Sequence, residues 1–205
     1  MKQRLIHLCL SAGLGLAGLA GTCPASAIEL AGTHFDDQLV MAGKPLRLNG
    51  AGVGYRFLFK VYAIALYLPE RRLTAQDVMN IDEPRRVMIT ALRELSSADF
   101  NDAVVTHFGP HGDDSAPRTA QKVLHLGRII SNLAPVLHKG DSLTLDWVPN
   151  EGMSMSYNQN VTPLPGHDRG FYNTLLAIWL GDKASDSTLR SNLLGRPAAS
   201  RAAVD

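Results

Sequence analysis

The apolar and polar positions of this 205-residue chain form their clearest pattern over residues 50–68, GAGVGYRFLFKVYAIALYL. Aromatic and β-branched residues dominate this segment, as is typical of a β-strand. If residues 54–68 run extended, their side chains point alternately to two faces. One face carries no charge and predicts a core, whereas the other presents Arg56, Lys60 and Tyr62 as hydrogen-bond donors. We therefore predict one long strand whose donors would hold an anionic group at the mouth of an apolar cleft.

The remainder of the chain mixes short strand patterns with amphipathic helix patterns. Strands are predicted over residues 34–40, 46–48, 86–92, 143–148 and 153–157. Helices are predicted over residues 74–80, 97–107, 119–133 and 168–180, with a short last helix capped by Asp186 or Ser187. Several links between strands have hairpin length, which favours an antiparallel sheet over a βαβ array. The fold class predicted is α+β, an antiparallel sheet with helices packed on one face.

The first 27 residues have the three parts of a secretory signal peptide. A positively charged start precedes an apolar run over residues 8–20, and Ala25-Ser26-Ala27 is typical of a cleavage site. We predict that residues 1–27 are a signal peptide, that cleavage falls before Ile28 and that the protein is periplasmic.

Cysteine and charge content narrow the function classes. Both cysteines, Cys9 and Cys23, fall in the leader, so the remaining chain has no disulfide, thiolate nucleophile or cysteine metal site. Without the leader the chain has 18 basic and 19 acidic side chains, a net charge of −1. This near-neutral charge and the absence of a basic block argue against nucleic-acid binding and against adhesion to an anionic membrane. No later segment reaches about 18 apolar residues, so we expect no membrane insertion. We expect one domain over residues 28–195 and a disordered tail over residues 196–205, and the oligomeric state stays open.

Two motifs resemble those of the chalcone isomerase-like family. GAG followed seven residues later by FKVYAIALYL resembles the family's signature, and GHDRGFYNTLLAIWLGDKASDSTLRSNLLG, residues 166–195, resembles its closing pattern. The resemblance extends over about residues 28–195. It implies an open-faced β-sandwich in which a ligand lies between the long strands and the helical layer.

The resemblance also implies roles for particular residues. The family's catalytic arginine lies in G-A-G-x-R, and this chain has Gly54 at the arginine position, with Arg56 two residues later. Tyr62 matches the family's threonine or tyrosine, so Arg56 and Tyr62 are the candidate catalytic residues. Together with Lys60 they are also candidate ligand-binding residues. We expect any isomerase activity to be weak, and we expect Gly54→Arg to raise it if the cleft is otherwise intact.

Two polar residues ahead of the last long helix complete the candidate ligand site. Asn160 resembles an asparagine that family members carry there, although a turn-forming role is the alternative, and Tyr157 could add a hydroxyl group.

A metal site is not predicted. His107 and His111 lie near two aspartates, but the prolines and glycines of HFGPHGDDSAP keep the histidines off a shared helix face. No phosphate-binding loop, nucleophile elbow or calcium loop is present, and we expect no cofactor.

Three functions remain open. The first is an exported protein that binds a small apolar anionic molecule, such as a fatty acid or a phenolic acid. The second is a chalcone isomerase-type intramolecular lyase, and the third is a non-catalytic interaction module. The missing arginine at Gly54 weakens the second, and retention of Tyr62 with a nearby arginine weakens the third.

Overall fold

The computed structural model describes residues 27–56, 58–96, 121, 125–129, 131–132, 136–164, 168–182, 184 and 186–196. The strands are β1 Ala27–Leu30, β2 Thr33–Asp36, β3 Gln38–Met41, β4 Lys44–Arg56, β5 Phe59–Leu68, β6 Arg85–Ala91, β7 Leu95–Ser96, β8 Val136–Leu137, β9 Ser142–Val148, β10 Gly152–Tyr157 and β11 Asn160–Leu164. The helices described from end to end are α1 Ala75–Asn80, α4 Arg169–Leu180 and α5 Ser187–Leu193.

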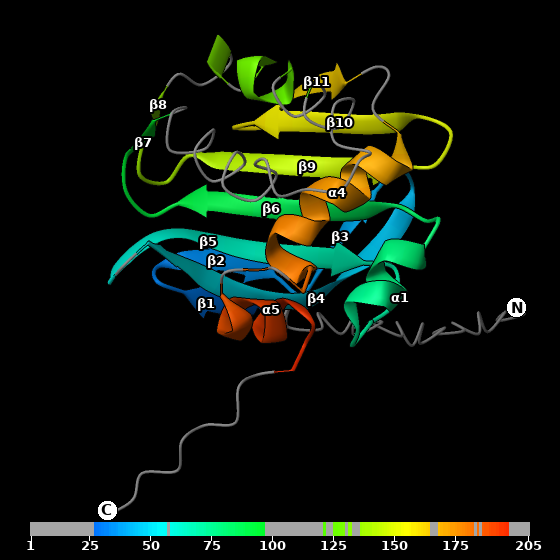
Figure 1. Cartoon of the computed structure of the whole chain (residues 1–205), viewed down its shortest axis with the longest axis horizontal. Helices are drawn as coiled ribbons and strands as arrows, with labels where there is room; N and C mark the ends of the chain where they lie inside the picture. Colours follow the sequence, from blue (N-terminus) through cyan, green and yellow to red (C-terminus); the bar gives the residue numbers. More distant parts are fainter. Residues whose placement is uncertain are drawn as a thin grey trace, which may run out of the picture.

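One large sheet organises the molecule. Seven strands pair in the order β11-β10-β9-β6-β5-β4-β3, and every pairing is antiparallel. Helix α4 crosses one face of this sheet, and α5 lies against β4 on that face (Figure 1). The prediction of an α+β fold, an open-faced antiparallel sheet with helices on one face, is confirmed.

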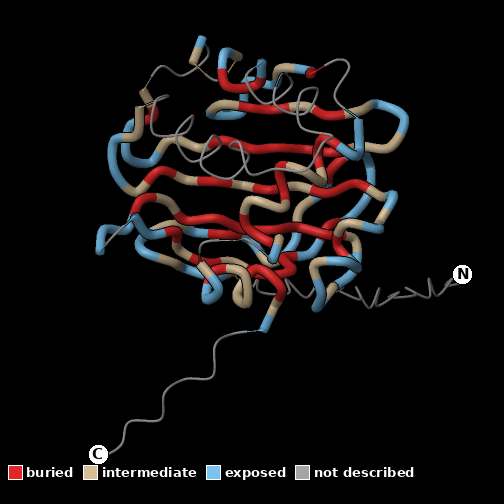
Figure 2. The backbone as a smooth tube through the Cα atoms, in the orientation of Figure 1, coloured by how far each residue is buried: buried red, intermediate tan, exposed pale blue. Residues whose placement is uncertain are grey.

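Apolar side chains pack on both faces of the sheet. On the helix-facing side, Ile64 and Leu66 of β5 share a buried cluster with Leu176 of α4. On the opposite side, Tyr67 packs with Phe35 of β2, and its hydroxyl donates to the Asp36 carbonyl at 2.9 Å. The residues in the middle of the long strands are therefore mostly buried, and those at the strand ends are more exposed (Figure 2).

The single strand predicted over residues 54–68 is wrong. Gly54 to Arg56 end β4, and the chain reverses so that β5 begins at Phe59 and pairs back with β4. The alternation pattern hid this turn because its residues are apolar rather than Gly, Asn or Pro. The predicted strand over residues 46–48 belongs to the same β4, and the strand predicted over 34–40 is divided between β2 and β3.

The capping signals were reliable. Thr74 caps α1 by accepting from the Asp77 amide, and Asp168 caps α4 by accepting from the Phe171 amide. Asp186 is the cap of α5.

Several predictions lie outside the described residues. They are the helix over 97–107, most of the helix over 119–133, the signal peptide apart from residue 27, and the tail beyond residue 196. Residues 125–129, which are described, are helical. Within the described part of the chain, no helix is both long and apolar enough to cross a membrane.

Candidate functional site

Tyr62 stands where the β4–β5 hairpin meets the helical layer. Its hydroxyl accepts a hydrogen bond of 3.0 Å from Nε1 of Trp179 on α4. Burial raises the pKa of Tyr62, and the Trp179 bond offsets this only in part. The phenol therefore stays neutral at physiological pH. A hydroxyl that accepts one bond keeps its own proton, so Tyr62 can donate to a second group.

A row of glycines on β4 makes room for this arrangement. Gly54 pairs with Tyr62, and a Cβ atom at residue 54 would lie 2.3 Å from the tyrosine Cζ. At Gly50 a Cβ would lie 2.0 Å from the carbonyl oxygen of Asn192, and at Gly52 it would lie 2.6 Å from a methyl of Leu189. The strand is thus stripped of side chains on its helix-facing side, so that α5 and the Tyr62 ring lie directly on it.

Asn49 fastens α5 to the same strand. Its side-chain amide donates to the Leu193 carbonyl at 2.7 Å and to the Arg72 carbonyl at 3.0 Å. Sequence reasoning missed this residue and the purpose of the glycines. The available signal was glycine at every second position, which is unusual inside a strand and often marks a close approach of another backbone.

Arg56 and Lys60 lie at the end of the hairpin. Arg56 pairs with Phe59, and Lys60 pairs with Tyr55, and both cations are exposed. The register shifts between these pairs and the Gly54 and Tyr62 pair. The structure therefore brings Arg56, Lys60 and Tyr62 to one end of the hairpin, but from two strands instead of one, and their binding roles stay predictions.

Tyr157 and Asn160 lie elsewhere on the sheet. Both belong to the β10–β11 hairpin, and Asn160 is exposed. Strand β10 is three places from β5, roughly 14 Å at about 4.8 Å per strand. The Tyr157 hydroxyl donates to a carboxylate oxygen of Asp141 at 2.7 Å. The five candidate residues therefore do not converge on one point.

The described apolar residues beneath α4 and α5 pack closely together. Seven apolar residues line a cavity of only about 10 Å³ there: Ile64, Leu66, Val87, Leu176, Trp179, Leu180 and Leu193. This volume is at the lower limit for a single water molecule. A ligand would have to lie beside the Tyr62 and Trp179 pair, outside this packed block.

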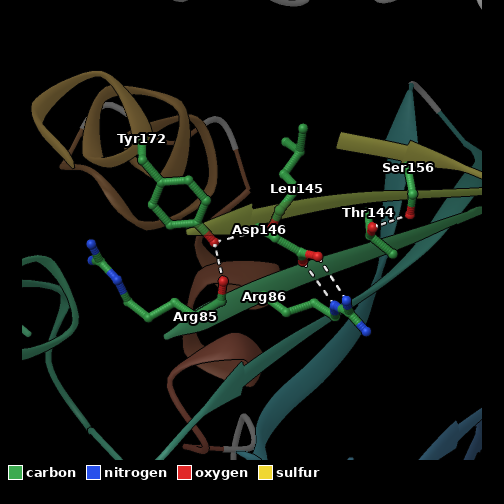
Figure 3. A network of polar contacts seen from close by, with 7 residues as sticks. All are labelled: Arg85, Arg86, Thr144, Leu145, Asp146, Ser156 and Tyr172. Carbon is green, nitrogen blue, oxygen red and sulfur yellow. Dashed lines mark hydrogen bonds and ion pairs between the residues drawn. The ribbon is translucent and has the colours of Figure 1, made fainter. Parts of the chain in front are cut away.

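Two adjacent arginines on β6 lie on opposite faces of the sheet. Sequence reasoning did not single them out. Arg85 is fully buried on the helix-facing side, where Nη1 donates to the Val78 carbonyl and to Oδ1 of Asn173, both at 2.8 Å. Its guanidinium lies 5.0 Å from the centre of the Tyr172 ring. Arg86 points to the other side and binds Asp146 through two bonds of 2.8 and 2.7 Å (Figure 3).

Tyr172 ties α4 to the sheet between these arginines. Its hydroxyl lies 3.2 Å from the carbonyl oxygens of both Arg85 and Leu145, and burial raises its pKa (Figure 3). On the far side, Thr144 and Ser156 share a hydrogen bond. These residues bond to one another across neighbouring elements, so we assign them to the scaffold that holds α4 in place. Among the described residues, Nε and Nη2 of the buried Arg85 find no hydrogen-bond partner.

No group of three or more metal-ligating side chains occurs among the described residues, and His107 and His111 lie outside them. A wider surface groove of about 310 Å³ is lined mainly by charged and amide groups: Glu70, Arg72, Asp77, Asn80, Ile81 and Glu83. Arg72 pairs with Glu70 at 3.1 Å, and Asp77 accepts from Thr74, so these side chains already have partners. The groove does not suit an apolar ligand.

The described structure defines an open-faced antiparallel α+β sandwich with a neutral tyrosine donor at the edge of its helical layer. Residues 27–195 match the family model described as chalcone isomerase-like, and the chain belongs to this family. A crystal structure of a fatty-acid binding protein from Arabidopsis thaliana has a similar fold, with a TM-score of 0.59 and 13% sequence identity. The match covers 82% of this chain and 96% of that one. The comparison with curated protein sequences finds no significant match.

Proposed function

We propose that the protein binds a small apolar anionic molecule, such as a fatty acid or a phenolic acid, with its anionic group at the Tyr62 hydroxyl. The observation that carries this proposal is the Tyr62 and Trp179 pair. Trp179 orients the hydroxyl, burial keeps it neutral, and its proton is available to a carboxylate or phenolate oxygen.

An apolar strip of the sheet would accommodate the rest of the ligand. Between Tyr62 and Tyr157 on the helix-facing side, Ala91, Ile89 and Leu143 belong to the same apolar cluster. These side chains match a hydrocarbon or aromatic tail in chemistry. All three are buried, so a tail would reach them only after the groups that cover them move aside. Tyr157 would then border the strip rather than contact the anionic group, because its hydroxyl donates to Asp141.

The cations at the hairpin end would strengthen anion binding. Arg56 and Lys60 lie on the two strands that also carry Gly54 and Tyr62. A guanidinium is the better partner for a carboxylate because its donors are fixed in a plane. Arg56→Ala should therefore weaken binding more than Lys60→Ala, and we expect no effect of Asn160→Ala.

The similar fold of a protein named for fatty-acid binding supports this class of ligand. An isomerase function is less well supported, because Gly54 occupies the position of the family arginine and its missing side chain is what admits the Tyr62 ring. An interaction module without a ligand would leave the neutral tyrosine donor unexplained.

We also propose that the protein acts in the periplasm, on the basis of the signal-peptide pattern in residues 1–27. N-terminal sequencing of protein from the envelope fraction should give a start at or near Ile28. An intact Met1 on that protein would contradict export by this route.

Calorimetric titration with a series of saturated fatty acids and a series of phenolic acids tests the ligand proposal. A hydrogen bond to a charged group contributes roughly 1.5 to 3 kcal/mol, so Tyr62→Phe should weaken binding by about 10- to 150-fold. Tyr67→Phe is the matched control, because Tyr67 is on the same strand but its hydroxyl serves the opposite face. Equal affinities of the two variants, or no binding by the unmodified protein, would refute the proposal.

A further inference from the structure

The outer end of the β4–β5 hairpin exposes an unusual amount of apolar surface. We call the described residues at this end, 55, 56 and 58–60, the hairpin tip. Within it Tyr55 is 52% exposed, Leu58 92% and Phe59 68%. Among the described residues only four other large apolar side chains are exposed, and they are scattered over the chain: Ile28, Val40, Leu73 and Val161.

Positive charge accompanies this apolar surface. Arg56 and Lys60, both exposed, lie within the hairpin tip. No aspartate or glutamate occurs anywhere in residues 38–69, so the hairpin itself carries no acidic residue. The near-neutral charge of the whole chain argued against adhesion to an anionic membrane, but it does not reveal this local excess of positive charge.

The hairpin tip is also a projecting feature. Strands β4 and β5 continue past the region where α5 covers them, and the end that they share lies at the left-hand extremity of the sheet in Figure 1. The same end is drawn as exposed in Figure 2. A narrow, projecting and apolar end can insert into a deformable surface while the rest of the fold stays outside it.

We propose that the hairpin tip docks the protein on the surface of an anionic lipid bilayer. Leucine and aromatic side chains are stable at the boundary between headgroups and acyl chains, where their apolar parts leave water. Arg56 and Lys60 would then lie at the level of the lipid phosphates. The contact is peripheral, and it requires no spanning helix.

The small size of the hairpin tip favours a bilayer over a protein partner. A stable protein interface buries about 800 Å² on each side, whereas a large aromatic side chain contributes about 150 to 250 Å². Three exposed apolar side chains fall short of that area. A bilayer imposes no such requirement, and its anionic headgroups complement the two cations.

This inference rests on the exposed apolar side chains, which take no part in the ligand site proposed at Tyr62, although Arg56 and Lys60 enter both proposals. It is tested by flotation of the purified protein with vesicles of phosphatidylglycerol and phosphatidylcholine, and with vesicles of phosphatidylcholine alone. The test variant is Leu58→Ser/Phe59→Ser, and the matched control is Val40→Ser/Val161→Ser, whose side chains are 73% and 66% exposed on β3 and β11. All variants share one N-terminus, so the apolar run over residues 8–20 contributes equally to each.

The unmodified protein and the control should bind the anionic vesicles alike, and the tip variant should bind at least about tenfold more weakly. Arg56→Gln and Lys60→Gln should each weaken binding about fivefold, and only on anionic vesicles. Equal binding of tip and control variants would overturn the proposal, as would no binding by the unmodified protein. The proposal would also be overturned if the tip variant bound vesicles as well as the unmodified protein does but no longer bound a protein partner. That result would favour protein docking. Thermal melting checks that each variant is folded.

Discussion

The inner and outer halves of the β4–β5 hairpin have similar residue types and opposite surroundings. In the inner half, Ile64 and Leu66 are buried beneath the helices, and glycines let α5 and Tyr62 lie on the strand. In the outer half, Leu58 and Phe59 are exposed. An apolar strand pattern therefore does not by itself decide whether a side chain is buried. Burial depends on whether another element packs on the strand. In this hairpin the glycines of β4 mark the place where α5 does so.

The largest effect is expected from Gly50→Ala in the inner half. The added Cβ would lie 2.0 Å from the Asn192 carbonyl oxygen and 2.7 Å from that of Leu193. Because both are backbone atoms, α5 must move, and we expect a loss of about 3 kcal/mol in the free energy of unfolding. Urea denaturation measures it. Gly52→Ala is the graded comparison, since its Cβ meets a Leu189 methyl that can turn away, and it should cost about 1 kcal/mol. Equal losses would contradict the backbone contact.

The next effect is expected from Gly54→Arg. The structure changes the expectation that this substitution would raise isomerase turnover, because its Cβ would lie 2.3 Å from the Tyr62 ring. The ring must swing out and break the Trp179 bond, costing about 1 to 3 kcal/mol of stability. We expect no gain in chalcone turnover, measured by absorbance. A clear gain in turnover would show that the Tyr62 ring moves aside at little cost, and it would support an isomerase function.

A smaller effect concerns alkaline pH and Tyr67, on the other face of the inner half. Burial, reinforced by Asp36, raises the pKa of Tyr67 to about 12, whereas an unfolded tyrosine ionises near pH 10. The stability from this residue is fully present below pH about 10 and is lost as the pH rises towards 12. The loss is at most about 1.4 kcal/mol per pH unit. Tyr67→Phe should flatten this decline in urea denaturation above pH 10. An unchanged slope would show that Tyr67 is not responsible.

The smallest effect on stability is expected in the outer half. Leu58→Ser/Phe59→Ser should change the free energy of unfolding by less than about 0.5 kcal/mol, because both side chains are already exposed. Urea denaturation again measures the free energy of unfolding. A loss of 2 kcal/mol or more would mean that the hairpin tip packs against the protein, and the contrast between the two halves would fail.

Local signals in the sequence were enough for much of the fold. Alternation placed Ile64 and Tyr67 on opposite faces, and capping residues located the starts of α1, α4 and α5. The turn before Phe59 was missed because its residues are apolar. Strand β11 was missed as well, since Pro163 interrupts its pattern and proline is confined to edge strands such as this one.

The candidate site was harder to predict, because its geometry depends on distant contacts. Tyr62 was identified from its position in the motif, but its partner Trp179 is 117 residues away. Alternation along one predicted strand placed Arg56 and Tyr62 on the same face. In the structure they belong to two strands, β4 and β5, and the hairpin brings both to the same end of the sheet. Alternation along β6 places Arg85 and Arg86 on opposite faces. It does not give their partners, Asn173 and Asp146, which are 88 and 60 residues away.

Native mass spectrometry of the protein purified from the cells that produce it tests the central claim most directly. We predict that a small apolar anionic molecule accompanies the unmodified protein and Tyr67→Phe, and that it is depleted in Tyr62→Phe. Absence of any bound molecule from all three proteins, or equal retention by Tyr62→Phe, would contradict a ligand site built on the Tyr62 hydroxyl.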